Sequence, residues 1–450
     1  MTAKVVIIGA GPAGIRATES LAGAGLQPVL IDEAARVGGQ IYRQPPAGSG
    51  RDPQALYGTE AAKATAIHTC LRRLEGRFDY RPRTLVWNIF KGDLDLMSES
   101  GHGRLKFDRL LIATGAFDRV IPFPGWTLPG VYTLGGAQIA LKAQGVAIGR
   151  RVALVGAGPL LPLVASQYLK AGAQIAVVID VTPRAAKLRA LGRMLAMPAM
   201  VRRGVSYLRT IRSHGVPAIY GAQAIRVEGT EAVEGISWKT ASGEWVRTEC
   251  DAVGASFGLR SETQLADVAG CEFTFDATLR QWLPKRTEAG RTTLDSVYLA
   301  GDCAGIGGAD VAELSGERAA QAIQEDLGMP VDDGRRAEIE RRLRRFARFR
   351  DGLERAYPFP HHLLDGLDES TTVCRCEGVD LHALREVYER TEPSEVNRQK
   401  AFSRVGLGRC QGRVCGLAAA ELLARFAGRP IESAGRMRSQ PPIKPIAIQT

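Results

Sequence analysis

Four cysteines near the carboxyl end of the chain have a spacing that could hold a metal centre. Cys374 and Cys376 are separated by one residue; 33 residues lie between Cys376 and Cys410, and four lie between Cys410 and Cys415. Four thiolates can bind one zinc ion or hold an iron-sulfur cluster. Zinc ribbons commonly space their first pair by about two to four residues, so the tighter first pair favours a 2Fe-2S cluster in which each pair binds one iron. A zinc site remains the alternative.

Charged groups around these cysteines suit a redox centre. Arg375, Arg409 and Arg413 lie among the cysteines, and a segment of helical character begins at Gly416. A cluster held by four thiolates is negatively charged, so basic side chains and the positive end of a helix stabilise it, the reduced form above all. The sequence therefore predicts a centre that accepts an electron.

A glycine-rich turn at the amino end could bind a dinucleotide. A short apolar run ends at Gly9, and Gly11 and Gly14 complete the pattern G-x-G-x-x-G before a segment of helical character. Gly9 permits a tight turn, Gly11 lets the backbone approach a pyrophosphate, and Gly14 lets the helix pack closely on the strand. A second apolar run ends at Asp32, which is placed to accept hydrogen bonds from a ribose. This order of elements predicts a Rossmann-like nucleotide site.

The same pattern recurs in the middle of the chain with one change. Gly156, Gly158 and Pro159 follow an apolar run, and the next apolar run ends at Asp180. The third glycine position is occupied by Leu161, whose side chain keeps helix and strand further apart. Asp180 favours NAD or another adenine nucleotide with a free ribose 2′-hydroxyl over NADP. Two interpretations stay open: an occupied nucleotide pocket, or a retained fold without a nucleotide.

Two further stretches complete a family pattern. Ala113, Thr114 and Gly115 follow another apolar run, and Gly301 and Asp302 follow a run late in the chain. With the glycine turns, they resemble the two-dinucleotide-domain flavoprotein family of glutathione reductase, thioredoxin reductase and ferredoxin reductases. The resemblance spans roughly residues 1 to 330. It implies an α/β fold whose first Rossmann-like domain binds FAD, with Asp302 accepting hydrogen bonds from the ribityl chain.

The pattern and this resemblance predict two sets of cofactor-binding residues. For FAD they are Gly9, Gly11, Pro12, Ala13, Gly14, Asp32, Glu33, Gly39, Gln40, Ala113, Thr114, Gly115, Gly301 and Asp302. For the second nucleotide they are Gly156, Gly158, Pro159 and Asp180. No set of residues beside the predicted flavin could bind and deprotonate an amine or hydroxy acid, so no catalytic residue is predicted.

The remaining cysteines exclude one activity of this family. Disulfide reductases need paired thiols beside the flavin, because two electrons are exchanged with a dithiol. Cys70, Cys250, Cys271 and Cys303 each stand alone, and a lone cysteine commonly behaves as a small buried hydrophobe. Electrons that leave the predicted flavin must therefore go elsewhere.

A strongly basic segment separates the flavoprotein pattern from the cysteines. Residues 333–357 place Ile339, Leu343, Phe346 and Phe349 at helical spacing among many arginines. The segment is either a solvated helix or a helix that docks the cysteine domain or a partner chain against the flavoprotein body. The prolines after Tyr357 predict a linker.

The cysteine spacing resembles the 2Fe-2S domain of the bacterioferritin-associated-ferredoxin type. The whole chain resembles the α-type component of bacterial heteromeric amino-acid and opine dehydrogenases: opine oxidase, D-hydroxyproline dehydrogenase and dye-linked L-proline dehydrogenase. Hydrogen cyanide synthase and the α chain of sarcosine oxidase are more loosely similar. The expected domains are a discontinuous FAD domain at 1–120 and 290–330, a second Rossmann domain of NAD type at 121–289, the basic helix and linker at 331–365, a mainly helical iron-sulfur domain at 366–430, and a tail at 431–450.

The resemblance implies an electron-transfer subunit with FAD and a 2Fe-2S cluster. Its implied partners are an FAD-containing β subunit that oxidises the substrate, in some relatives a small γ ferredoxin, and a respiratory electron acceptor. The alternatives are an NAD(P)H-dependent ferredoxin or acceptor reductase, a hydrogen cyanide synthase type of subunit, and an iron-sulfur sensor or zinc-held interaction protein.

Composition bounds these hypotheses. The 450 residues are 45% apolar and 24% charged, which is typical of a globular protein. The net charge of +11 comes from basic residues that are scattered rather than gathered into an aromatic-interleaved patch, so we expect no nucleic-acid binding. The longest weakly polar stretch, residues 152–165, is too short to span a bilayer. With no signal sequence visible at the start, we expect a cytoplasmic protein, peripheral to the inner membrane only through partners.

Overall fold

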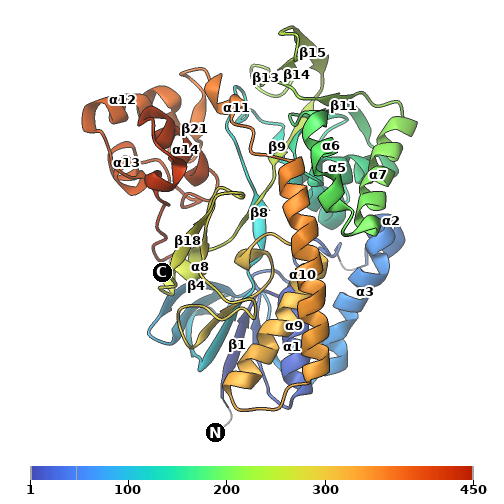
Figure 1. Ribbon diagram of the computed structural model, residues 1–450, viewed down its shortest axis with the longest axis vertical. Coiled ribbons are helices and arrows are strands. Elements are labelled where there is room, and N and C mark those ends of the chain that lie inside the picture. The colour runs from blue at the N-terminus through green and yellow to red at the C-terminus, as the bar shows by residue number, and fades with distance from the viewer. Residues whose placement is uncertain (1–2, 47, 448–450) are drawn as a thin grey trace.

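The computed structural model describes residues 3–46 and 48–447. Two parallel sheets with helices packed on them form the body of the molecule, and a small helical domain lies beside them (Figure 1). This arrangement confirms the predicted α/β class with two Rossmann-like sheets.

The first sheet has the strand order β20-β7-β1-β2-β3 and is parallel throughout. Its strands are β1 (Val5–Ile8), β2 (Val29–Ile31), β3 (Asp79–Arg81), β7 (Arg109–Ile112) and β20 (Val297–Leu299). Short apolar runs buried on both faces are what a parallel sheet covered by helices requires. Helices α1 (Pro12–Gly23) and α9 (Ala309–Asp326) pack side by side against it. The last strand comes from late in the chain, so this domain is discontinuous.

The first glycine turn needs glycine at two positions, because other backbone atoms lie too close to leave room for a side chain. A Cβ atom on Gly14 would lie 1.8 Å from the carbonyl oxygen of Gly9, and one on Gly9 would lie 2.3 Å from the carbonyl oxygen of Ala113. Gly9 also has a φ of 107°, which favours glycine. The turn between β1 and α1 therefore needs both glycines before any nucleotide is considered.

The second sheet is also parallel, with the order β12-β11-β10-β16-β9. It consists of β9 (Val131–Thr133), β10 (Arg151–Ala157), β11 (Gln174–Asp180), β12 (Ala218–Tyr220) and β16 (Ala252–Phe257). Helices α4 (Leu134–Ile139), α5 (Leu160–Lys170), α6 (Arg184–Met194) and α7 (Pro198–Ser213) accompany it. Two short antiparallel strands, β8 (Ala116–Asp118) and β17 (Leu259–Ser261), connect the two domains.

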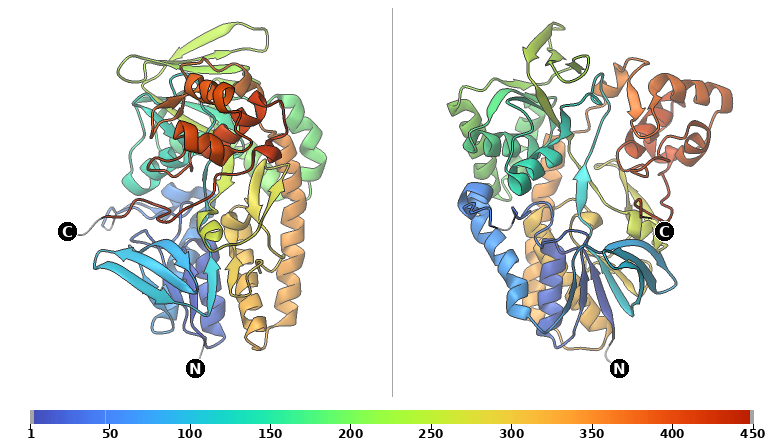
Figure 2. Two further views of the ribbon diagram at one scale, coloured as in Figure 1. Left: turned by 90° about the vertical axis from the view of Figure 1, so that its left-hand side faces the viewer. Right: turned by 180° about the vertical axis from the view of Figure 1, so that it is seen from behind.

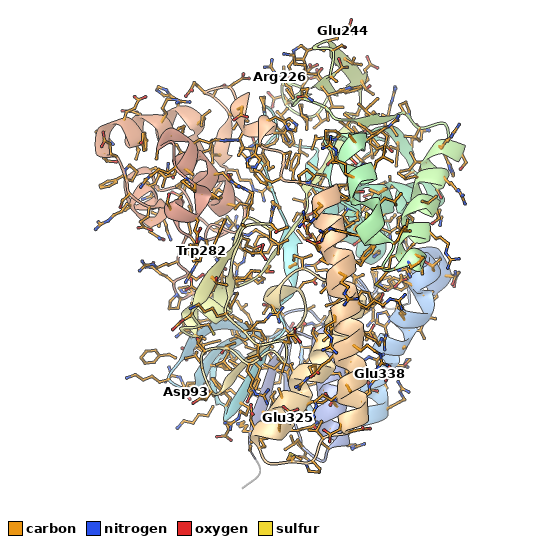
Figure 3. The ribbon with its side chains drawn as sticks, in the orientation of Figure 1. Asp93, Arg226, Glu244, Trp282, Glu325 and Glu338 are labelled. Carbon is orange, nitrogen blue, oxygen red and sulfur yellow. The ribbon has the colours of Figure 1, made fainter. Side chains whose placement is uncertain are left out.

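Three antiparallel units and several short helices extend the body. A sheet of β4 (Leu85–Phe90), β5 (Asp93–Ser98) and β6 (Gly101–Lys106) lies beside the first domain, and α8 (Gln264–Val268) packs on β4. Helices α2 (Pro53–Tyr57) and α3 (Ala61–Cys70) lie on the opposite side of that domain, where α3 contacts α1 (Figure 1). The others are β13–β15 (Ala224–Glu228, Gly235–Lys239, Trp245–Glu249) and the hairpin of β18 (Phe273–Asp276) and β19 (Gln281–Pro284). In Figure 3, Glu244 marks the outer tip of the β13–β15 sheet and Trp282 lies on the hairpin below the helical domain.

The predicted basic helix is α10 (Asp333–Ala356). Ile339, Phe346 and Phe349 are buried, and Leu343 is half-buried. The helix runs along both Rossmann-like domains and packs on α6 and α9 (Figure 1). Its apolar stripe therefore faces the body, and its arginines cover the outside.

The cysteines lie in the small C-terminal domain. This domain contains α11 (His362–Asp365), the two-stranded β21 (Thr372–Cys374) and β22 (Val379–Asp380), and helices α12 (Leu381–Thr391), α13 (Val396–Ser403) and α14 (Gly416–Phe426). Its apolar core is continuous with that of the second Rossmann-like domain. A buried ion pair between Arg280 and Glu421, with N to O distances of 2.7 and 2.8 Å, also attaches it. The domain is thus docked rather than tethered (Figure 2).

The end of the chain returns to the first domain. Arg436 donates two hydrogen bonds to the carboxylate of Asp267, at 2.6 and 2.7 Å. Ile443 is buried against the β4–β6 region, and its N–H donates to the carbonyl of Trp87. Lys444 pairs with Glu33. The tail is therefore a strap from the C-terminal domain to the end of β2. No helix of the described residues combines the length and apolarity needed to cross a membrane.

Candidate flavin site and cysteine cluster

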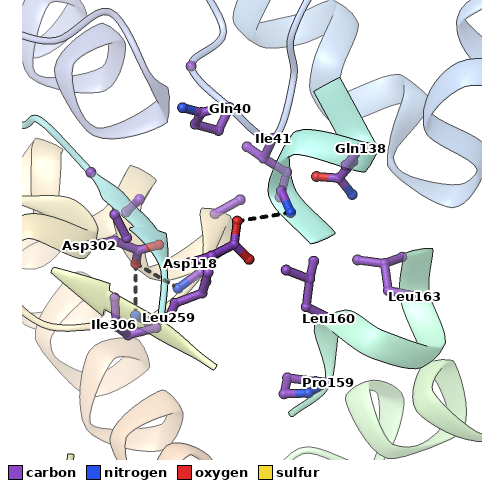
Figure 4. Close-up of a pocket in the computed structure, with 18 of the residues that line it drawn as sticks. Gln40, Ile41, Asp118, Gln138, Pro159, Leu160, Leu163, Leu259, Asp302 and Ile306 are labelled. Carbon is purple, nitrogen blue, oxygen red and sulfur yellow. Dashed lines mark hydrogen bonds between the residues drawn. The ribbon is translucent and has the colours of Figure 1, made fainter. Parts of the chain in front are cut away.

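A cavity of about 1700 Å³ lies between the two Rossmann-like domains. Figure 4 shows side chains of both domains around it: Gln40 and Asp302 come from the first domain, while Pro159 and Leu160 come from the second. Ligands of open parallel sheets bind at the carboxyl ends of the strands, which is where β1, β2, β7 and β20 reach this cavity. The cavity is therefore a nucleotide-type site.

Most residues predicted for FAD line this cavity. They are Gly9, Gly11, Pro12, Ala13, Asp32, Glu33, Gly39, Gln40, Ala113, Thr114, Gly115, Gly301 and Asp302. Gly14 does not line it, because its place is at the contact between α1 and β1. The sequence pattern therefore gathers residues that are up to 293 positions apart, from Gly9 to Asp302, around one space.

Two carboxylates organise the backbone of this site. Asp32 accepts hydrogen bonds from the N–H of Ala10 at 2.5 Å and of Ala34 at 2.6 Å. Burial raises the pKa of Asp32, and these two bonds oppose that shift. Asp302 accepts from the N–H of Gly307 at 2.8 Å and of Gly308 at 2.9 Å through one oxygen (Figure 4). Each carboxylate fixes a loop that borders the cavity.

Two ionisable groups in the cavity wall carry no sequence motif. Asp118 accepts from the N–H of Gly135 at 3.0 Å (Figure 4), and burial raises its pKa. Lys142 donates to the carbonyl of Ile41 at 2.8 Å, and burial lowers its pKa to about 8. Asp118 lies in β8 and contacts the start of α4, whereas Lys142 lies in the turn after α4 and reaches the first domain at Ile41. Only the tertiary arrangement reveals them, since neither stands in a diagnostic spacing.

The second nucleotide motif has a different environment. Pro159 and Asp180 line the cavity, whereas Gly156 and Gly158 do not. Asp180 is 5% exposed, and its carboxylate accepts from the N–H of Thr182 at 2.8 Å and pairs with Lys187. Burial raises the pKa of Asp180, and Lys187 opposes this. The acceptor expected for a ribose is therefore already occupied by a lysine of the same chain.

Aromatic rings surround this ion pair. The Nζ atom of Lys187 lies 4.5 Å from the ring centre of Tyr220 and 5.0 Å from that of Tyr357, the residue after α10. Arg184 lies 4.5 Å from the ring centre of Tyr220. Leu161, which replaces the third glycine, is buried. The second pocket is thus partly filled by its own side chains.

The four C-terminal cysteines lie together at the start of α14 and the end of β21. Cys374 and Cys415 are buried, whereas Cys376 and Cys410 are partly exposed. The sulfur of Cys415 lies within hydrogen-bonding reach of the sulfurs of Cys374 and Cys410, and these interactions lower the pKa of Cys374 to about 6 and that of Cys410 to about 5. Cys376 contacts Cys410. In the part of the chain that the structure describes, no group of three or more Cys, His, Asp or Glu side chains has an arrangement that could hold a metal ion.

Arg413, between the last two cysteines, connects this cluster to the cavity. Its Nε donates to Glu262 at 2.7 Å, and its Nη1 donates to the carbonyl of Ile443 at 2.8 Å. Both charged side chains are 13% exposed. On the other side, the N–H of Glu262 donates to the carbonyl of Gly115, and its carbonyl accepts from the hydroxyl of Thr114 at 3.1 Å. Glu262 thus joins a cysteine loop to the turn after β7, with one hydrogen bond to Arg413 and two to Thr114 and Gly115.

The guanidinium group of a second, half-buried arginine lies at the same junction. Arg260 lies over the ring of Phe117 and donates to the carbonyl of Arg413 at 3.4 Å. Its Nε has no hydrogen-bond acceptor among the described residues. Burial lowers the pKa of Arg260, while the nearby Glu262, Cys415 and Cys410 favour its charge. A buried cation without full pairing calls for additional negative charge.

Comparisons with known proteins agree with this architecture. A model of the pyridine nucleotide-disulphide oxidoreductase family matches residues 3–325. The chain belongs to this family. The A-type component of opine oxidase from Agrobacterium tumefaciens (strain Ach5) is 35% identical over 99% of this chain and 90% of its own length. The HcnB component of hydrogen cyanide synthase from Pseudomonas aeruginosa PAO1 is 32% identical over 99% and 97%.

Solved structures show the same fold at lower identity. L-proline dehydrogenase from P. horikoshii superposes with a TM-score of 0.71 at 20% identity, covering 99% of this chain and 78% of that one. T. acidophilum thioredoxin reductase gives 0.53 at 20% identity, covering 72% and 98%. This member of the pyridine nucleotide-disulphide oxidoreductase family is therefore a flavoprotein oxidoreductase related to the A-type component of opine oxidase. The predicted class of enzyme and the predicted relationship to opine oxidase and hydrogen cyanide synthase are confirmed.

Proposed function

We propose that this chain is the FAD- and 2Fe-2S-containing electron-transfer subunit of a heteromeric dehydrogenase. The substrate would be an amino acid, an opine or hydroxyproline, oxidised at its CH–NH bond in an FAD-containing β subunit. The names of the relatives support an assembly of several subunits: the A-type component of Rhizobium meliloti opine oxidase is 34% identical, and the alpha component of sarcosine oxidase from Corynebacterium sp. (strain P-1) is 24% identical. A small γ ferredoxin and a respiratory acceptor complete the proposed chain of carriers.

The observation that carries this proposal is the contact between Glu262 and Arg413. It joins the turn at Thr114–Gly115, which lines the cavity, to the loop that bears Cys410 and Cys415. Both side chains are mostly buried, so the pair holds the two sites in a fixed relationship and keeps water from the junction. Electron transfer between two centres requires that kind of stable proximity.

The residues of the first domain fit FAD. Gly11 leaves the backbone of the β1–α1 turn open to a pyrophosphate, and α1 begins there with its positive end toward the cavity. Asp302 uses one oxygen for its own loop, which leaves the other for a ribityl hydroxyl. When bound, the flavin would supply the ability to accept electrons in pairs and release them singly to a cluster that holds one.

The cysteine residues fit a 2Fe-2S cluster in their donor chemistry. Two pairs of thiols gather at the start of α14, and Cys374 and Cys415 are shielded from water. Arg260 and Arg413 lie beside them, and Arg260 lacks an acceptor for its Nε among the described residues. A negatively charged cluster would supply the charge that this buried guanidinium requires. Cys374, Cys376, Cys410 and Cys415 would be its ligands.

The second pocket argues against a reductase that uses NADH. Lys187 forms an ion pair with the carboxylate of Asp180. The side chain of Leu161 is buried beside the motif, and the half-buried ring of Tyr357 contacts Lys187. A nicotinamide nucleotide would have to break a buried ion pair to use Asp180. If the pocket takes an adenine nucleotide, we propose that the nucleotide contacts Pro159 and the aromatic rings instead.

The test is to express the full chain with ample iron and riboflavin and purify it without oxygen. We expect one FAD, two iron atoms and two acid-labile sulfides per chain, with an electron paramagnetic resonance signal after reduction. If the purified chain contains stoichiometric zinc instead, the proposal is wrong and the zinc-held interaction protein is the better assignment. Bleaching of the flavin by NADH at catalytic rates would replace it with the reductase.

A second arm identifies the substrate. Co-expression with a neighbouring flavoprotein gene should give a complex that oxidises octopine, nopaline, hydroxyproline or proline with an artificial acceptor, while the isolated chain does not. The 32% identity to HcnB makes cyanide release the matched comparison, because formation of cyanide by the complex would assign the chain to that group instead.

A further inference from the structure

An apolar surface lies on α6 and α7 of the second Rossmann-like domain. Twelve large hydrophobic side chains are exposed among the described residues, and five of them belong to this short region: Leu188, Leu191, Leu195, Val205 and Leu208. Their exposed fractions range from 40% for Val205 to 72% for Leu188. Single exposed hydrophobes are ordinary, whereas a concentration of this kind marks an interaction surface.

The spacing places these side chains in one row on each helix. Leu188, Leu191 and Leu195 follow at intervals of three and four residues, and Val205 and Leu208 are three residues apart. Four of the five, all except Leu195, also border the same large cavity. The two rows therefore lie on the same side of the domain, and Figures 1 and 2 show α7 at its outer edge.

The surrounding charge has a single sign. Residues 184–214 contain eight arginines and lysines and no aspartate or glutamate. Lys187, Arg193 and Arg203 pair with acids elsewhere in the chain, and Arg184 lies over the ring of Tyr220. The other four are exposed and have no acidic partner among the described residues: Arg189, Arg202, Arg209 and Arg212. We call these four and the five apolar residues the basic apolar surface.

We propose that the basic apolar surface docks on an anionic lipid bilayer. Leucine and valine side chains would enter the boundary between headgroups and acyl chains, and the arginines would remain at the level of the phosphates. A protein partner is the less favoured occupant, because a cluster of basic residues without acids on amphipathic helices is typical of surfaces that bind anionic lipid headgroups. This inference is independent of the proposed cofactors and substrate.

The experiment is cosedimentation of the full-length protein with vesicles. Phosphatidylcholine vesicles with about a quarter phosphatidylglycerol should bind the protein, pure phosphatidylcholine should bind it at least about tenfold more weakly, and about 0.5 M salt should release it. We expect Leu188→Ser with Leu195→Ser, and separately Arg202→Gln with Arg209→Gln, to lower the binding constant by at least about tenfold each.

The matched control changes exposed hydrophobes elsewhere. Phe90→Ser with Trp245→Ser, at positions 62% and 52% exposed, should leave vesicle binding unchanged. Circular dichroism and bound FAD should be the same in all variants. The proposal is wrong if the unmodified protein stays in the supernatant with phosphatidylglycerol vesicles, or if the control pair lowers binding as much. It is also wrong if the leucine pair disrupts a protein complex while vesicle binding persists.

Discussion

Nε of Arg413 donates a hydrogen bond of 2.7 Å to the carboxylate of Glu262, across 151 positions of sequence. The pair spans the junction between the C-terminal domain and the cavity wall, and neither partner is more than 13% exposed. Charge-assisted hydrogen bonds of this kind contribute about 1.5 to 3 kcal/mol. We therefore expect a structural change at the cysteine cluster to affect the cavity through this ion pair.

We expect Glu262→Gln to loosen this junction without removing either cofactor. The amide keeps the shape of the side chain but removes its charge, so docking of the C-terminal domain should weaken by about 1 to 2 kcal/mol. Hydrogen exchange of residues 366–430 should increase, and stopped-flow transfer from flavin to cluster should slow. Glu272→Gln, in an exposed pair with Lys285, is the control. Faster exchange throughout the protein would show general destabilisation instead.

Cys410→Ser should abolish the iron-sulfur signal and leave FAD bound. The cysteine lies in the C-terminal domain, while the residues proposed for FAD lie in the first Rossmann-like domain. Iron analysis, sulfide analysis and the flavin absorbance measure both cofactors in one sample. Cys250→Ala, at a buried cysteine outside the cluster, should keep both. Loss of FAD together with iron would contradict the separation of the two sites.

Lys142→Met should raise stability at neutral pH. Burial lowers the pKa of Lys142 from 10.5 to about 8, so below pH 8 the folded protein holds a charge that water stabilises better in the unfolded chain. The native protein should therefore gain stability as the pH rises from about 8 to 10.5, where only the unfolded chain keeps the proton. The free energy of unfolding of the variant should not rise between about pH 8 and 10.5, and at pH 7 it should exceed that of the native protein by on the order of 1 to 3 kcal/mol. Thermal melts at about pH 7 and pH 10 measure both effects, and an unchanged pH profile would contradict them.

Lys187→Met should destabilise the second Rossmann-like domain. It leaves the buried carboxylate of Asp180 without its partner, which costs about 3 kcal/mol. Asp180→Asn combined with Lys187→Met removes both charges and should recover most of that loss. Thermal unfolding of the two single variants and the double variant gives the coupling. Additive effects would mean that the pair does not interact.

The sequence was most informative where backbone conformation is demanded by local geometry. The pattern assigned Gly9 to the tight turn and Gly14 to the contact between helix and strand. In the structure, a Cβ atom at either position would collide with a main-chain oxygen. Asp302 likewise follows a strand at a position that topology brings to the cavity.

Contacts between distant segments were not accessible in this way. The pairing of Lys187 with Asp180 and the buried Lys142 depend on how helices pack, and no spacing encodes them. Glu262 and Arg260 acquire their meaning only when the C-terminal domain docks. A glutamate and an arginine at such positions are commonly solvated surface residues, so the sequence alone provides no reason to select either of them.

Because the tail returns to the first Rossmann-like domain, the whole C-terminal segment cannot be exchanged between relatives without also changing contacts of the first domain. Residues 436–444 belong to the C-terminal segment in sequence, yet Ile443 is part of a core of the first domain and Lys444 pairs with Glu33 beside the cavity. If a chimera took its whole C-terminal segment from a relative, the relative's tail would replace residues 436–444 where they pack on the first domain beside the cavity. Such grafts should be designed with the crossover after residue 435, so that each body retains its own strap.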